Sequence, residues 1–436
     1  MREPVVILGG GLAGLSAAYH LNGQAALYEQ RTSLGGLCSQ LIVDQFRFDA
    51  VPHVLHFQRA DMFGLVQQLL GGRLRSYHRH ARVYSHGTYT RYPFQAHLFG
   101  LPPAVIQECV QGRLAVSHQR PETNTFERWV ATTFGEGIAK HFMVPYNTKF
   151  WTVPPSELTC EWLDGMVPVP TCEQTVAGAF VDDPAEYGYN VEFWYPSAGG
   201  LGGLFEAFLQ RLPRVQLGKR LVQMDTQRRR LCFSDGDTVE YDQLLCSIPM
   251  PELKPLLEPL PEEVARAFDA LRWTSLAVVH LGVRGAAPVP WHWVYVPEDA
   301  FLFYRVGIPS HYAPDAAPEG CHAISAEISC SAWRNLEQAH LVPRVIENLL
   351  TLGLLRAPED VIAQRPLILR YGYPIYDHNY VWATGLIRSY LREQGIEVMG
   401  RFGSWQYLSM EATLLSGQRA AQQLSATRVD HGALLR

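Results

Sequence analysis

Three glycines near the start of the chain have the spacing of a phosphate-binding turn. Gly9, Gly11 and Gly14 form the pattern GxGxxG between an apolar segment and a segment with helical periodicity. In such a turn the first two glycines let the backbone approach a pyrophosphate, and the third lets helix and strand pack closely. Glu29 follows Gly9 by twenty residues, at the end of the next apolar segment, where a carboxylate can bind ribose hydroxyls. Together these residues predict a dinucleotide site.

The elements that position this motif are predicted as a strand, a helix and a strand. Residues 5–8 are expected to form a buried strand, residues 15–21 a helix and residues 25–28 a second strand. A later segment, NVEFWYPSAGGLGGLFEAFLQRL, again passes from a strand through glycines into a helix, and GRFGSWQYLSMEATLLSGQRAAQQL is a glycine turn that leads into a helix. The segment LVQMDTQRRRLCFSDGDTVEYDQLLCSIP alternates as strands do, with a hairpin turn at Asp235 and Gly236.

The rest of the chain predicts a helical subdomain and a second sheet. Residues 98–142 have a helical pattern, with Thr123 or Asn124 as the cap of a helix that begins near Phe126. The segments LAVVHLGV, WHWVYV and FLFYRVGI are expected to be strands. The expected fold is α/β. Its parts are a discontinuous Rossmann-type domain of residues 1–90, 190–250 and 395–425, an inserted, mainly helical subdomain of residues 95–185, and a substrate-facing, mainly antiparallel β-sheet domain with helices of residues 251–394.

Composition excludes several classes of protein. The 436 residues are 47% hydrophobic and 18% charged, as in a globular protein, and the net charge of −5 with no long basic run argues against nucleic-acid binding. Eight cysteines occur without a CxxC pair, which argues against a metal site or a disulfide framework and for reduced thiols. No stretch has the length of a transmembrane helix. We therefore expect a soluble, cytoplasmic protein without integral membrane association.

The order of the glycine segments resembles a flavoprotein superfamily. Gly35 and Gly36 come six residues beyond Glu29, YPSAGGLGGL resembles a second characteristic block, and Gly400 with Arg401 resembles the C-terminal flavin segment. These features resemble the superfamily of amine oxidases, protoporphyrinogen oxidase and UDP-galactopyranose mutase, which implies that the discontinuous domain binds FAD. The resemblance further implies that the backbone of Val222 meets the adenine, and that Met410 begins a helix directed at the flavin pyrimidine edge, where the helix dipole favours the negative charge of a reduced flavin.

Five further blocks resemble the UDP-galactopyranose mutases, most closely those of eukaryotic type. They are RYPFQ, PYNTKFW, FYR, GYP and GRFGSWQY. The substrate residues implied by this resemblance are Tyr92, Phe94 and Gln95 around the uracil, Asn147 and Trp151 nearby, Arg305 on the diphosphate, and the hydroxyls of Tyr373 and Tyr407. Aromatic faces, amides and a guanidinium suit a base and a diphosphate.

The resemblance implies an isomerisation in which flavin is the nucleophile. N5 of the reduced FAD would attack the anomeric carbon of UDP-galactose or a related nucleotide sugar and interconvert its pyranose and furanose forms without net oxidation. His53 would lie against the flavin and Arg305 would stabilise the departing diphosphate. NAD(P)H is the candidate electron donor, and the resemblance specifies no oligomeric state.

The match to the mutases departs at a few positions. Met166 stands where a diphosphate-binding arginine is expected, four residues after Trp162. Val51 and Pro52 replace two glycines before His53, and the arginine expected just before the glycine pair is displaced to Arg31. A different nucleotide sugar is therefore possible as substrate. Basic residues that could compensate for Met166 are Arg82, Arg91 and His97.

Two other functions and several structural roles remain open at this stage. An FAD-dependent oxidase or desaturase is the alternative activity, and a non-enzymatic protein that retains FAD is a third possibility. Phe94 or Trp151 taken alone is more often a core residue, Arg305 could pair with Glu327, and a lone His53 is usually structural.

Overall fold

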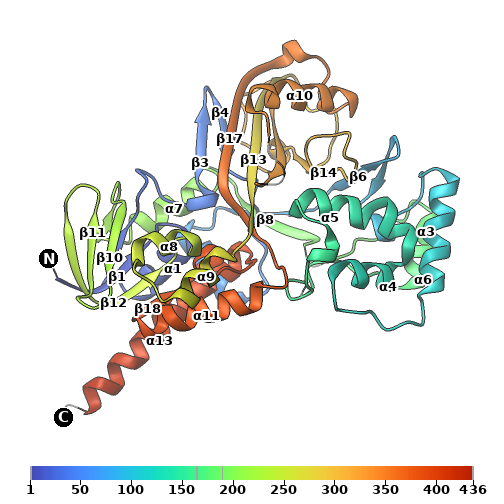
Figure 1. Ribbon diagram of the computed structural model, residues 1–436. Coiled ribbons are helices and arrows are strands. Elements are labelled where there is room, and N and C mark those ends of the chain that lie inside the picture. Colours follow the sequence, from blue (N-terminus) through green and yellow to red (C-terminus); the bar gives the residue numbers. More distant parts are fainter. Residues whose placement is uncertain (1, 164, 189, 333, 335, 435–436) are drawn as a thin grey trace.

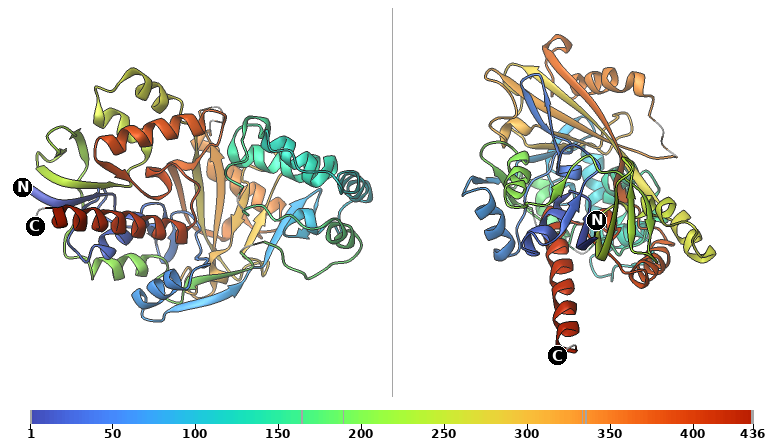
Figure 2. Two further views of the ribbon diagram at one scale, coloured as in Figure 1. Left: turned by 90° about the horizontal axis from the view of Figure 1, so that it is seen from below. Right: turned by 90° about the vertical axis from the view of Figure 1, so that its left-hand side faces the viewer.

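The structure, a computed structural model, describes residues 2–163, 165–188, 190–332, 334 and 336–434, with only the backbone described for 426–434. Figure 1 shows one sheet near the N-terminus, a second sheet above the middle of the molecule, and a group of helices on the right. Figure 2 shows the same parts from two other directions, with the C-terminal helix projecting from the body. The mixed α/β architecture predicted from the sequence is confirmed.

The first sheet is built around β1 (Arg2–Leu8), whose last four residues are apolar and buried. β1 pairs in parallel with β12 on one side and β2 on the other, so the carboxyl ends of these strands meet at one edge. Within the described residues, this sheet has seven strands: in spatial order β10 (Leu221–Asp225), β11 (Arg230–Phe233), β12 (Thr238–Cys246), β1, β2 (Ala26–Tyr28) and β9 (Val215–Gln216), with β18 (Ile396–Val398) paired to β12.

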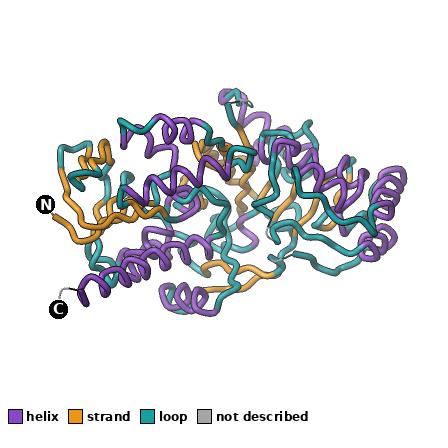
Figure 3. The backbone as a smooth tube through the Cα atoms, turned by 60° about the horizontal axis from the view of Figure 1, so that its bottom comes forward, coloured by secondary structure: helices purple, strands orange, loops and turns teal. Residues whose placement is uncertain are grey.

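Helices surround this sheet on both sides. They are α1 (Leu12–His20), α2 (Ala60–Leu69), α7 (Gly202–Leu209), α8 (Met250–Leu257), α9 (Glu262–Asp269), α11 (Tyr380–Glu393), α12 (Gly400–Gly403) and α13 (Met410–Leu434). α1 and α13 pack so closely that a Cβ at Gly417 would overlap the carbonyl oxygen of Ala13. Figure 3 shows the chain ending in a long helix, which is α13. Within the described chain, every helix is too short or too polar to cross a membrane.

The second sheet is mainly antiparallel, as predicted. Its spatial order is β17 (Val361–Pro374), β13 (Trp273–Arg284), β16 (Cys321–Cys330), β15 (Arg305–Gly307), β14 (Trp293–Tyr295), β6 (Ala81–Ser85) and β7 (Thr88–Arg91), and β14–β6 is its parallel pair. α10 (Gln338–Thr351) packs its apolar side, including Leu341 and Val345, against β13. Two separate antiparallel sheets of the described chain have two strands each: β3 (Gln40–Val43) pairs with β4 (Phe46–Asp49), and β5 (Leu74–His78) pairs with the distant β8 (Glu192–Pro196).

The helical part contains α3 (Pro103–Ala115), α4 (Phe126–Ile138), α5 (Val144–Trp151) and α6 (Cys172–Phe180). The cap of α4 was predicted at Thr123 or Asn124, and this is wrong by one or two residues. Thr125 is the cap, and its side chain accepts a hydrogen bond of 3.2 Å from the backbone N–H of Arg128. Glycines let α3 and α4 approach, because a Cβ at Gly135 would overlap the backbone of Gly112.

The sheets divide the chain differently from the predicted boundaries at two places. β6 and β7 lie within residues 1–90 or at their edge, yet they extend the second sheet through the β14–β6 pair. α9 and α11 lie within residues 251–394, and α8 begins one residue before them, yet α8 packs on β10 and α11 on β18 of the first sheet. Non-local strand pairing decides both assignments, and local sequence patterns do not contain it.

Candidate active site

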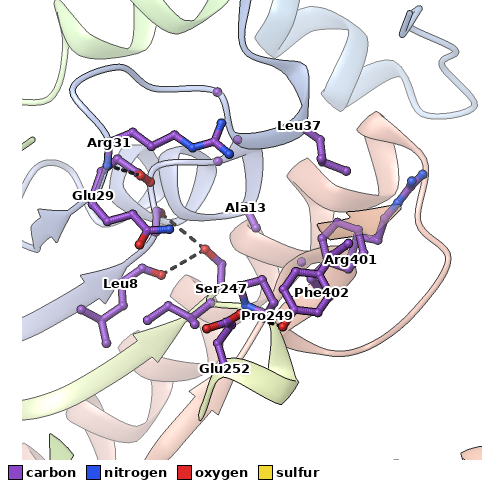
Figure 4. A pocket seen from close by; sticks show the side chains of 18 of the residues that line it. Leu8, Ala13, Glu29, Arg31, Leu37, Ser247, Pro249, Glu252, Arg401 and Phe402 are labelled. Atoms are coloured by element: carbon purple, nitrogen blue, oxygen red, sulfur yellow. Dashed lines mark hydrogen bonds between the residues drawn. The ribbon is translucent and has the colours of Figure 1, made fainter. Parts of the chain in front are cut away.

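A cavity of about 800 Å³ opens at the carboxyl ends of β1, β2 and β12. This position, at the edge where parallel strands end, is where nucleotide ligands bind in open α/β sheets. Figure 4 shows the cavity wall, with Leu8 and Glu29 on one side and Arg401 and Phe402 on the other. The predicted residues that line it are Gly9, Gly11, Glu29, Gly35, Gly36, His53, Val222, Gly400, Arg401 and Met410.

The three glycines of the GxGxxG motif meet different structural requirements. Gly9 has φ of +102°, a conformation that favours glycine. A Cβ at Gly14 would overlap the carbonyl oxygen of Gly9, so this glycine allows α1 to pack on the turn. Gly14 does not line the cavity, whereas Gly11 does, and a Cβ at Gly11 would have no atom within 4 Å. The space next to Gly11 therefore suits the close approach of a pyrophosphate.

Glu29 is held by the turn that it faces. The backbone N–H of Gly10 donates to its Oε2 at 2.7 Å, and the N–H of Arg31 donates to its Oε1 at 2.8 Å. Each carboxylate oxygen keeps a second lone pair, so Glu29 can still accept hydrogen bonds from ribose hydroxyls. Figure 4 shows Arg31 beside Glu29 on the cavity wall. Arg31, which is displaced from the position expected just before the glycine pair, therefore still lies at the cavity.

At the other end of the cavity, Arg401 organises the segment that leads into α13. Its Nε and Nη2 donate to the carbonyl oxygen of Leu408 at 3.0 and 2.6 Å. Its guanidinium lies 4.9 Å from the ring centre of Tyr407 and 5.6 Å from that of Tyr373. α13 begins at Met410, as predicted, so the positive end of its dipole is at the cavity.

His53 lines the same cavity as a neutral imidazole. Its Nδ1 donates to the carbonyl oxygen of Val51 at 2.8 Å, which leaves Nε2 as an acceptor. Burial, together with the nearby charges of Arg401 and Arg305, lowers the pKa of His53 to about 3 against the opposing effect of the Val51 hydrogen bond. The residue is therefore uncharged near neutral pH.

Arg305 forms an ion pair with Glu327, which is the structural alternative that the sequence left open for this arginine. Its Nε and Nη2 donate to the two carboxylate oxygens of Glu327 at 2.6 and 2.7 Å, and Tyr304 donates to the same carboxylate at 2.9 Å. Glu327 is fully buried. Burial alone would lower the pKa of Arg305, but the charge of Glu327 raises it well above its ordinary value. The pair carries no net charge.

Several predicted substrate residues form one aromatic wall. Tyr92 stacks on Tyr295 with ring centres 4.6 Å apart, and Tyr373 lies 5.5 Å from Tyr407. Tyr295 pairs directly with Arg305 between β14 and β15. Arg401, which lines the large cavity, lies next to Tyr373 and Tyr407, so the wall borders that cavity without lining it. The role of these residues in substrate binding stays a prediction.

Four other predicted substrate residues are packed inside the protein. Phe94 and Trp151 have no exposed surface, and Phe94 stacks on Phe142 at 5.0 Å. Gln95 donates to the carbonyl oxygen of Pro168 at 2.7 Å, and Asn147 donates to that of Met143 at 2.8 Å. These four side chains line neither described cavity. Their role in substrate binding therefore stays a prediction, and the packing shows that each of them contributes to the core around the aromatic wall.

The residues at which the sequence departs from the mutases also have defined places. Val51 is buried and supplies the carbonyl that fixes His53, and Met166 packs against the main core. Of the three compensating basic residues, Arg82 and Arg91 line a second cavity. His97 is buried, and burial lowers its pKa to about 4, so it supplies no positive charge near neutral pH.

Sequence reasoning missed some residues of the large cavity. Ser247 donates to the carbonyl oxygen of Leu8 at 3.0 Å and lies against Gly9. Its place just after β12, next to β1, was a usable signal, since carboxyl ends of neighbouring parallel strands share one edge. Glu252 and Tyr371 also line the cavity and hydrogen-bond to one another at 2.7 Å. No local pattern marks this pair, because it joins segments over a hundred residues apart.

The size of the cavity, the glycine turn and Glu29 together fit a dinucleotide cofactor of FAD type. Among the described residues, no group of three or more His, Cys, Asp or Glu side chains could hold a metal ion. The fold and the cavity define the class of Rossmann-type flavoproteins. The sequence profile of the flavin containing amine oxidoreductases matches residues 12–350. The chain belongs to this family, and its cofactor is FAD.

Comparison with solved structures gives similarities over nearly the whole chain. A crystal structure of reduced UDP-galactopyranose mutase has a TM-score of 0.91 and 27% identity, and covers 98% of this chain and 94% of that one. A protein assigned as a protoporphyrinogen oxidase, from an Exiguobacterium species, has a TM-score of 0.75 and 17% identity, and covers 98% of this chain and 99% of that one. The second similarity concerns the fold alone.

A curated relative matches over a short stretch. The carotenoid 3,4-desaturase of Haloarcula japonica is 37% identical over 87 residues, which are 19% of this chain and 17% of the desaturase. The matched stretch is thus about a sixth of that protein.

Proposed function

We propose that the protein is a flavin-dependent nucleotide-sugar mutase that interconverts the pyranose and furanose forms of UDP-galactose or a related sugar nucleotide. The observation that carries this proposal is the TM-score of 0.91 with reduced UDP-galactopyranose mutase, over 98% of the chain, compared with 0.75 for the protoporphyrinogen oxidase relative. We further propose that the protein works in the cytoplasm and that NAD(P)H reduces it.

The cofactor, when bound and reduced, supplies the nucleophile, and the chain supplies binding and orientation. The turn at Gly9 and Gly11, with Glu29, holds the dinucleotide. Arg401 fixes the segment that precedes Met410, so that the positive end of the α13 dipole favours the negative charge of a reduced flavin. These contacts support the proposal that the isoalloxazine would bind near the start of α13 and the aromatic wall.

The sugar nucleotide would lie along Tyr92, Tyr373 and Tyr407, whose faces and hydroxyls suit a sugar and a diphosphate. Arg305 has N–H groups beyond the two that bind Glu327, and these can donate to a phosphate oxygen as it leaves. The buried core of Phe94 and Trp151 supports this wall from behind and keeps water away from it.

His53 is assigned as a neutral acceptor next to the cofactor. Its Nδ1–H is used by Val51, so Nε2 is available to accept a hydrogen bond or a proton. A neutral imidazole does not oppose the positive charges of Arg401 and Arg305, which an imidazolium at this place would repel.

An oxidase or desaturase remains the second candidate, and the stretch shared with the carotenoid desaturase favours it. The two activities differ in what they consume. Anaerobically reduced protein mixed with UDP-galactose should give the furanose isomer without oxygen uptake. The oxidised protein with the same sugar nucleotide should be inactive. Product formation by the oxidised protein together with peroxide would favour the oxidase instead.

A further inference from the structure

A second cavity, of about 330 Å³, lies beside β6 and β7 and is bounded by residues 184–186. We call it the basic cavity. Its chemical groups are the guanidiniums of Arg79, Arg82 and Arg91, the aromatic rings of Tyr92 and Trp291, and the carboxylate of Glu186. A cavity of this size is at the lower end of the range for small-molecule sites.

The walls of the basic cavity carry more positive than negative charge. Arg91 is neutralised by Asp182, to which its Nε donates at 2.6 Å. Glu186 is exposed and lies 3.8 Å from the ring nitrogen of His78. Within the described part of the chain, no ion pair joins a carboxylate to Arg79 or Arg82. Arg79 and Arg82 therefore lack a direct ion-pair partner among the described residues, and Asp182 acts on Arg82 only from a longer distance.

Arg79 is a buried cation with neutral partners. It is 6% exposed, donates to the carbonyl oxygen of Tyr187 at 2.9 Å and to the side-chain oxygen of Asn190, and lies 4.6 Å from the ring centre of Tyr92. Burying a charge without a counter-ion costs free energy. An anion in the adjoining cavity would lower that cost.

Arg82 has unused hydrogen-bond donors at the cavity. Its guanidinium lies 5.4 Å from the ring centre of Trp291 and makes a single long hydrogen bond, 3.3 Å, to the carbonyl oxygen of Ala81. Burial lowers the pKa of Arg82 and the charge of Arg91 lowers it further, against the opposing effect of the Asp182 carboxylate. Two neighbouring guanidiniums that repel each other gain most from a ligand that binds both, and phosphate oxygens match guanidinium geometry.

We propose that the basic cavity binds a phosphate group, with Arg82 and the N–H groups of Arg91 that Asp182 does not use donating to its oxygens, and with Trp291 and Tyr92 contacting the organic part of the ligand. Tyr92 connects this cavity to the aromatic wall through its stack on Tyr295. The proposal rests on the proposed function only for the identity of the ligand. The arginines of the basic cavity would supply the positive charge that the methionine at position 166 cannot provide.

The test is a calorimetric titration of the oxidised, FAD-loaded protein with inorganic pyrophosphate and, separately, with UDP. Arg82→Met and Arg91→Met should each weaken pyrophosphate binding about tenfold or more, since each removes a charge-assisted contact. Arg365→Met is the matched control, because Arg365 is exposed on β17, at the opposite edge of the second sheet. Flavin absorbance and the melting temperature show that each variant is folded. If wild-type protein fails to bind pyrophosphate, or if both cavity variants bind it as tightly as wild type, the proposal is overturned.

The UDP titration identifies the source of the phosphate. Weaker UDP binding by Arg82→Met places the phosphates of the nucleotide in the basic cavity. Unchanged UDP binding with weakened pyrophosphate binding indicates a separate phosphate compound at this site. Both titrations use oxidised protein and need no turnover. Intact pyrophosphate binding without sugar isomerisation would therefore reject the mutase and keep the phosphate site. Sugar isomerisation without pyrophosphate binding would reject the phosphate site and keep the mutase.

Discussion

Arg305 and Glu327 face each other on neighbouring strands of the second sheet, and the arginine binds both oxygens of a carboxylate that has no exposed surface. The two residues are directly opposite in the β15–β16 register, so the backbone fixes their pairing. This relationship makes Arg305 important to stability as well as to any ligand that it contacts.

Replacing Arg305 by Met should therefore destabilise the fold as well as weaken nucleotide binding. Removing one member of a buried ion pair leaves the other charge unpaired and costs about 3–5 kcal/mol. The double variant Arg305→Met, Glu327→Leu should recover much of that loss, because no charge is then left in the core. Urea unfolding measures both, and a single variant as stable as wild type would show that the pair is not coupled as described.

Gly11 and Gly14 should respond differently to alanine. Gly11→Ala should leave the unfolding free energy nearly unchanged but weaken FAD binding, because its methyl group would enter the space for the pyrophosphate. Gly14→Ala should lower stability by several kcal/mol, on the order of a strained core substitution, because its methyl group overlaps the carbonyl oxygen of Gly9. Thermal unfolding and flavin fluorescence separate the two effects. Equal behaviour of the two variants would contradict these roles.

The carboxyl group of Asp49 should make stability depend on pH. It accepts a hydrogen bond of 2.6 Å from Tyr195, and burial raises its pKa to about 7. Because the folded protein holds this proton more tightly than the unfolded chain does, the stabilisation is complete below about pH 4 and is lost as pH rises to about 7.

Asp49→Asn keeps an acceptor for Tyr195 without the titrating proton. The difference in unfolding free energy between the variant and wild type should shift in favour of the variant by about 1.4 kcal/mol per pH unit between pH 4 and 7, and level off above pH 7. Comparing the two proteins cancels contributions from other groups. A difference that stays constant across this range would show that Asp49 titrates normally.

His53 should have the opposite pH dependence. Its pKa is lowered to about 3 mainly by burial, so the unfolded chain takes up a proton at a higher pH than the folded protein does. The stability gained from the neutral ring is present above about pH 6.5 and is lost as pH falls toward 3. His53→Asn can keep the hydrogen bond to Val51 and should lose less stability than wild type between pH 6.5 and 4. At pH 8 it should retain FAD and lose most turnover, and full turnover would remove His53 from the site.

The parts of the fold that local patterns determine were predictable. The turn at Gly9 and the acidic Glu29 lie within one strand–helix–strand unit, where spacing alone sets the geometry. The start of α13 at Met410 follows from a glycine turn before an apolar helix. The sequence also offered Glu327 as the partner of Arg305, and the structure confirms that pairing.

The rest depends on contacts between distant segments. Phe94 has the residue type of a base-stacking platform, but its stack on Phe142 is set by the packing of the helical part, which no spacing in the sequence encodes. The basic cavity forms because β6 pairs in parallel with β14, which brings Trp291 beside Arg82. Long-range pairing of this kind also moved β6 and β7 into the second sheet.

The central claim is that the reduced flavoprotein isomerises a sugar nucleotide without consuming an oxidant. Its most direct measurement is the chromatographic composition of UDP-galactose after incubation with dithionite-reduced protein under anaerobic conditions, beside an unreduced sample. The account predicts that the furanose form appears in the reduced sample alone, up to a constant equilibrium fraction. No furanose from UDP-galactose or any related nucleotide sugar, by protein shown to carry reduced FAD, would contradict it.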